Sequence, residues 1–83
     1  MLHHVHIFVQ LKDGVLDIQG KAVANSLVSL GHDSLGSVKV GKYIQLWVDA
    51  DSAADARKEA EKMCDDLLVN PIIEQYRIEV EGE

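Results

Sequence analysis

The sequence predicts an α+β domain in which a small three-stranded sheet carries two helices on one face, in the order β-α-β-α-β. Three segments alternate apolar and polar residues, and the two segments between them repeat apolar residues at spacings of three and four. Glycine, aspartate and proline separate these segments. The chain has 83 residues and contains no linker, repeat or low-complexity stretch, so we expect residues 1–83 to form a single domain.

The first strand is expected over residues 2–11. Val5, Ile7 and Val9 share one parity and form a purely apolar face, whereas His4, His6 and Phe8 share the other parity with Leu2. Asp13-Gly14 then provides a turn signal.

A helix is expected to follow from Asp17 to about Leu30. The Asp17 carboxylate is suited to accept the unpaired backbone N–H groups of the first turn. Val23 and Leu27 form an apolar stripe with Leu30 and the neighbouring Ala24. Gly31 is placed to end the helix.

The middle strand has two interpretations. Five apolar residues keep one parity across Gly41: Val38, Val40, Ile44, Leu46 and Val48. This pattern favours one long strand that bends at the glycine. In the alternative, Gly41-Lys42 is a two-residue hairpin turn, which would give a ferredoxin-like variant. Lys42 falls on the apolar parity, so we expect it to reach solvent at the bend or to meet an acidic group of a partner.

The second helix begins with Asp51 or Ser52 as its cap and ends at Asn70-Pro71. Its predicted buried stripe consists of Ala53, Ala56, Ala60, Met63 and Leu67. Leu67→Ala should therefore lower stability by about 2–5 kcal/mol. Cys64 lies beside the stripe and is expected to be a small buried apolar residue. The last strand places Tyr76, Ile78 and Val80 inward.

The helix-free face of the sheet carries large side chains: Leu2, His4, His6, Phe8, Tyr43 and Trp47. Because such groups on an uncovered face usually mark an association surface, we expect this face to contact protein. Trp47→Asp should then disrupt association and leave the monomer fold intact.

His4 and His6 point the same way, about 6.6 Å apart along the strand, so the sequence allows a two-histidine metal site. A structural zinc site needs four ligands, and Cys64 and His32 belong to other elements. We therefore favour half-buried strand histidines and predict no metal, catalytic or cofactor-binding residue. A metal-binding module using His4 and His6 remains an alternative.

Composition restricts the partners. The net charge of −6 and the pI near 5.0 argue against binding to nucleic acid or to an anionic membrane surface. A single cysteine forms no internal disulfide. No apolar run approaches a membrane span and no signal-peptide pattern is present, so we expect a cytoplasmic protein.

Four motifs occur in order along the chain: "LKDGVLDIQGKAV", "SLG", "VKVGKYIQL" and "CDDLLVNPIIEQYRIEVE". Together they resemble the PurS family, the small subunit of phosphoribosylformylglycinamidine (FGAM) synthase. One position departs from the family pattern, because Ile18 stands where the family usually has proline. Proline there would preorganise the first helical turn.

The resemblance implies a non-catalytic, self-associating subunit of an ATP- and glutamine-dependent enzyme of purine biosynthesis. It would bridge the PurQ glutaminase and the PurL synthetase and assist ammonia transfer between them, while those partners use glutamine, ATP and Mg²⁺. The resemblance also implies that a set of motif residues shapes the loops and contacts the other subunits. These residues are Lys12, Gly14, Asp17, Gln19, Gly20, Gly41, Lys42, Asn70, Pro71, Glu74 and Tyr76. A free-standing dimeric module that binds a small molecule is a further alternative, based on fold analogy alone.

Overall fold

The computed structural model describes all residues from Met1 to Glu83. Its elements follow the predicted order β-α-β-α-β, with one π-helical turn added after the second helix. They are β1 (Leu2–Leu11), α1 (Ile18–Ser29), β2 (Lys42–Asp49), α2 (Ala53–Met63), η1 (Cys64–Leu68) and β3 (Glu74–Val80). The predicted fold class is confirmed.

The three strands form one antiparallel sheet in the order β2-β1-β3, so β1 is the central strand. In this register Val5 lies opposite Leu46 on one side and Val80 on the other, and Ile7 lies opposite Ile44 and Ile78. Apolar residues therefore meet apolar residues across both strand pairs, and the predicted inward parity is confirmed.

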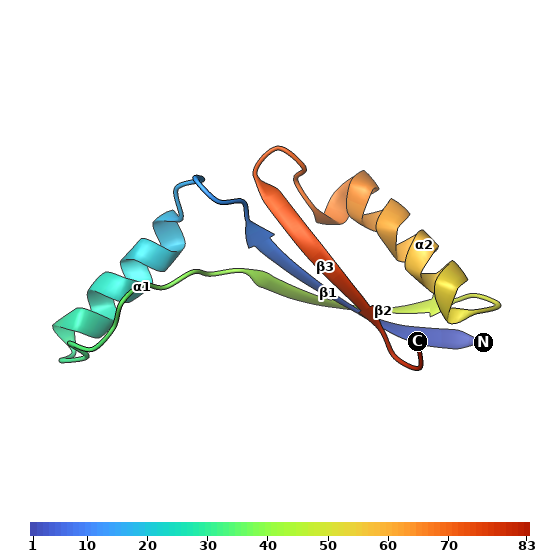
Figure 1. Cartoon of the computed structure of the whole chain (residues 1–83), viewed down its shortest axis with the longest axis horizontal. Coiled ribbons are helices and arrows are strands. Elements are labelled where there is room, and N and C mark those ends of the chain that lie inside the picture. The colour runs from blue at the N-terminus through green and yellow to red at the C-terminus, as the bar shows by residue number, and fades with distance from the viewer.

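The core lies between this apolar face and α2 (Figure 1). Ser52 caps α2 by accepting a hydrogen bond from the Asp55 N–H. Ala56 and Ala60 are fully buried, and their small side chains let the helix lie close to the strands. The buried cluster is completed by residues from the strands and the π-turn: Val5, Ile7, Val9, Val48, Cys64, Val69, Ile78 and Val80.

The expectation that both helices cover this face is wrong for α1, which extends away from the end of the sheet and packs against none of the strands (Figure 1). The molecule consequently measures 50 × 25 × 15 Å. Its radius of gyration is 16.3 Å, whereas a compact chain of this length has about 12 Å. The physical reason is that α2 already occupies the apolar face, so the stripe of α1 finds no free sheet surface. We call residues 12–41 the arm.

The middle strand begins only after Gly41, at Lys42. Val38 and Val40 precede it in extended chain outside the sheet, so they are not the first part of a long strand. The hairpin alternative is also wrong, because β2 pairs with β1 over Leu2–Val9. A Cβ atom on Gly41 would lie 2.4 Å from the Val9 carbonyl oxygen, so the glycine permits close passage of the chain past β1.

The end of the second helix corrects the predicted stripe. At η1 the Val69 N–H donates to the Cys64 carbonyl at 3.1 Å, five residues back, so this turn contains one residue more than an α-helical turn. Cys64 is buried as predicted, and the next buried position is Val69. Leu67 is 85% exposed, and the expected large cost of Leu67→Ala is therefore wrong.

Candidate functional site

The uncovered side of the sheet is the first candidate surface, and we call it the aromatic face (Leu2, His4, His6, Phe8, Tyr43 and Trp47). The register places His4 opposite Trp47, and their rings stack with centroids 4.5 Å apart. Phe8 lies opposite Tyr43, and these rings stack at 5.0 Å. Tyr43 and Trp47 remain 52% and 60% exposed because α2 lies on the other side of the sheet.

The same face also carries polar side chains whose positions the sequence pattern did not predict. His6 lies between Gln45 of β2 and Glu79 of β3. Arg77 lies opposite Phe8, with its guanidinium carbon 4.4 Å from the centre of the Phe8 ring, and it forms an ion pair with Glu79. The face thus combines aromatic rings with charged side chains. This mixture is typical of a surface that contacts another protein.

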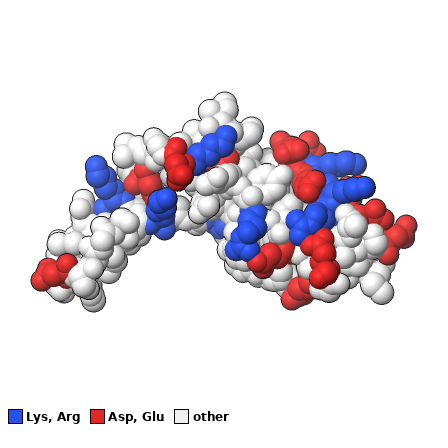
Figure 2. Space-filling model, viewed as in Figure 1, with Lys and Arg blue, Asp and Glu red and all other residues white.

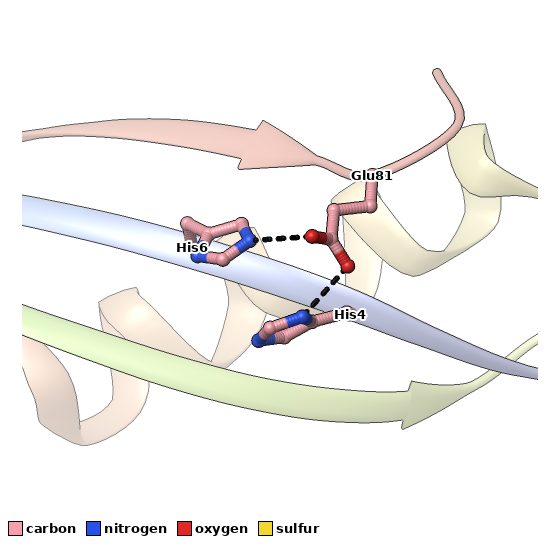
Figure 3. Close-up of side chains that lie close together, drawn as sticks. All are labelled: His4, His6 and Glu81. Carbon is pink, nitrogen blue, oxygen red and sulfur yellow. Dashed lines mark hydrogen bonds and ion pairs between the residues drawn. The ribbon is translucent and has the colours of Figure 1, made fainter.

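His4, His6 and Glu81 form a cluster at one end of this face (Figure 3). The His4 Nδ1 lies 2.7 Å from Glu81 Oε2, and the His6 Nε2 lies 3.4 Å from Glu81 Oε1. The hydrogen bond with His4 is the main cause that lowers the pKa of Glu81, and the bond with His6 acts in the same direction. The sequence offered no third ligand beside the two histidines, because only the pairing of β1 with β3 brings Glu81 to them.

The second candidate surface lies where the arm joins the sheet. Asp17 caps α1 as predicted: its Oδ1 accepts from the Gly20 N–H at 2.8 Å. Its Oδ2 accepts from the Val40 N–H at 2.9 Å, which ties the helix to the returning chain. These two backbone hydrogen bonds lower the pKa of Asp17. A Cβ on Gly20 would lie 2.6 Å from the Val38 carbonyl oxygen, so the two passes of the arm approach closely there.

Further motif residues meet beside this junction. The Lys12 ammonium donates to the Pro71 carbonyl oxygen at 2.6 Å. The Asn70 N–H donates to Glu74 Oε1 at 2.8 Å. Glu74 Oε2 lies 3.4 Å from the ammonium of Lys42, so Lys42 meets an acidic group of its own chain while its side chain stays 56% exposed.

The remaining motif residues differ in position. Gly14 has a φ of 84° in the turn that leaves β1, a conformation that favours glycine. Tyr76 lies on β3 at the edge of the core, where burial raises the pKa of its hydroxyl. Gln19 is exposed on α1 and lines a small pocket at the junction with Asp17, Lys42 and Glu74.

A groove of about 540 Å³ lies at the junction of arm and sheet. Four cationic residues line it, and each already has a partner: Lys12 with Pro71, Lys39 with Asp13, Lys42 with Glu74 and Arg77 with Glu79. Three of these cations are therefore ion-paired with carboxylates, whereas Lys12 donates to a neutral carbonyl oxygen. On the face shown in Figure 2, acidic and basic side chains are interspersed.

Neither helix has the length and apolar character that crossing a bilayer demands.

Comparison with known proteins gives a consistent result. The family model described as PurS: phosphoribosylformylglycinamidine (FGAM) synthase matches residues 4–82. The chain is 42% identical over 78 residues to phosphoribosylformylglycinamidine synthase subunit PurS of Synechocystis, covering 94% of this chain and 78% of the relative.

Two solved structures agree with this match. One is Methanocaldococcus jannaschii PurS, one of the subunits of formylglycinamide ribonucleotide amidotransferase in the purine biosynthetic pathway. It has a TM-score of 0.88 and 31% identity, and the alignment covers 98% of both chains. The other is a chain of the PurLQS structure from Thermotoga maritima, with a TM-score of 0.89, 30% identity and coverage of 96% of this chain and 98% of that one.

Proposed function

Since the chain belongs to the PurS family of FGAM synthase subunits, we propose that it is the non-catalytic small subunit of that enzyme and bridges its glutaminase and synthetase subunits. In this role it helps ammonia released from glutamine to reach the ATP- and Mg²⁺-dependent synthetase without loss to water. The larger subunits hold glutamine, ATP and Mg²⁺, and the residues of this chain supply contacts.

The observation that supports this proposal is that the molecule leaves two separate apolar surfaces uncovered. One is the aromatic face, with Trp47 and Tyr43 exposed. The other is the arm, where Leu16, Ile18 and Leu30 are 65%, 73% and 76% exposed. A bridge has to contact more than one neighbour at once, and two apolar surfaces on different parts of an elongated molecule meet this requirement.

We assign the two surfaces different partners. The aromatic face lies on a regular sheet and pairs with the same face of a second copy, because stacked sheets need a broad flat contact. The arm carries the motif residues at its junction and contacts the larger subunits. Only 11 of the 83 residues are buried in the single chain, so contacts with partners add substantially to its apolar burial.

Reconstitution with the glutaminase and synthetase from the same organism tests the bridge. With glutamine as nitrogen donor, FGAM formation should collapse when this chain is omitted. With ammonia as donor, turnover should persist without it, because the synthetase receives its nucleophile directly from solution.

Ile18→Asp gives a sharper version of this test. Ile18 is the first residue of α1, where an acidic side chain suits the helix N-terminus, so the arm should stay folded while losing an apolar contact. Glutamine-dependent turnover should fall and ammonia-dependent turnover should not. Leu67→Asp, at an exposed position of η1, is the matched control. Equal glutamine-dependent rates with and without the chain would refute the bridge.

A further inference from the structure

The cluster of His4, His6 and Glu81 has the composition of a metal site, and we propose that it binds one divalent transition-metal ion, with Zn²⁺ as its representative. The possible ligand atoms of the three residues all lie within 4.8 Å of one another. Two imidazoles and one carboxylate suit Zn²⁺, Ni²⁺ or Cu²⁺, whereas Ca²⁺ and Mg²⁺ prefer oxygen ligands alone.

The outer nitrogen of each imidazole has a partner of its own. The His4 Nε2 is hydrogen-bonded to Gln45 Oε1 at 2.7 Å. The His6 Nδ1 is hydrogen-bonded to the Tyr43 hydroxyl. Metal-binding histidines usually have their second nitrogen held in this way, which fixes the ring and its tautomer.

This arrangement directs the inner nitrogens, His4 Nδ1 and His6 Nε2, toward the Glu81 carboxylate (Figure 3). A divalent cation placed among these atoms would contact both imidazoles and the carboxylate, whose ligand atoms lie within 4.8 Å of one another.

The backbone holds the three residues in place before any ion binds. His4 and His6 are two residues apart on the central strand, so their side chains share a face. The Glu81 N–H donates to the His4 carbonyl oxygen at 3.0 Å, which continues the pairing of β1 with the chain after β3. The His4 and His6 side chains are only 22% and 18% exposed, whereas that of Glu81 is 60% exposed.

Three protein ligands leave a fourth position of a tetrahedral ion for water.

Calorimetric titration of the full, untagged chain with Zn²⁺ tests the proposal. One ion per chain should bind saturably, and His6→Gln or Glu81→Gln should abolish this binding. His32→Gln and Glu61→Gln carry the same changes at exposed positions on other elements, and they should bind as the unmodified chain does. Circular dichroism should show that all four variants keep the native fold.

Two further measurements separate the site from binding at the surface. Gln45→Met removes the acceptor for His4 and should weaken Zn²⁺ affinity by about 10- to 100-fold without changing the stoichiometry. Co²⁺ should quench the fluorescence of Trp47, the only tryptophan, because the ring of Trp47 lies 4.5 Å from that of His4. Absence of saturable Zn²⁺ binding would overturn the proposal, as would equal affinity in Glu81→Gln and Glu61→Gln.

Discussion

Gly41 shows how a single residue joins the arm to the sheet. It lies at the point where the returning chain enters β2, and a side chain there would collide with the Val9 carbonyl oxygen of the central strand. Gly36 lies in the same returning segment, and a Cβ there would meet nothing within 4 Å. The two glycines therefore have different structural importance although they are five residues apart.

Gly41→Ala should lower the free energy of unfolding by about 1–3 kcal/mol, because the backbone of β1 or β2 has to shift to admit the methyl group. Gly36→Ala, the matched control, should change it by no more than about 0.5 kcal/mol. Chemical denaturation of both variants measures the difference. Equal denaturation midpoints for the two variants would mean that the close approach at Gly41 does not affect stability.

At the scale of elements, the π-helical turn η1 decides which residues of the second helix reach the core. The sequence pattern passes from Ala60 to Met63 and Leu67, as an unbroken α-helix would. Cys64, at the start of the wider turn, is buried as predicted, but the turn half-buries Leu68 and leaves Leu67 exposed. One additional residue in a single turn is enough to rotate the last part of the stripe away from the sheet.

Leu68→Ala should accordingly destabilise the chain by about 0.5–3 kcal/mol, because Leu68 packs against the buried cluster. Leu67→Ala should stay within about 0.5 kcal/mol of the unmodified chain. Thermal or denaturant unfolding compares them directly. A larger loss for Leu67→Ala than for Leu68→Ala would restore the α-helical register and exclude the π-turn.

On the scale of the whole molecule, the arm and the aromatic face leave the chain elongated and incompletely covered. The radius of gyration of 16.3 Å follows from α1 lying beyond the end of the sheet. The rings of the aromatic face stack on one another within the chain, yet Trp47 keeps 60% of its surface exposed. Both features are explained by the proposed assembly with other chains.

Trp47→Asp should shift the sedimentation coefficient toward that of a monomer, since a charge introduced into a sheet-to-sheet contact is left without a partner. Its unfolding free energy in the monomer should change little, because Trp47 is not part of the buried cluster. Leu67→Asp, on the opposite side of the sheet, should sediment as the unmodified chain does. An unchanged oligomer in Trp47→Asp would place self-association on another surface.

Local patterns in the sequence determined the elements and their caps. The alternation from Leu2 to Leu11 predicted β1 at its observed bounds, Asp17 was correctly identified as the cap of α1, and Gly31, with a φ of 100°, follows its end. These features depend on interactions between residues close in the chain, so the sequence alone was sufficient. The ordered motifs likewise resemble PurS through their residues alone, and the match of the family model confirms this resemblance.

Only the tertiary structure decided which distant groups meet. The pairing of β1 with both neighbours placed Glu81 and Gln45 beside the histidines, and neither residue carries a local signal of that contact. The sequence also left the position of α1 undetermined. An apolar stripe indicates that a helix packs against something, but it does not identify the surface. Strand register and the competition between two helices for one sheet face are settled by packing over the whole chain, which no local pattern encodes.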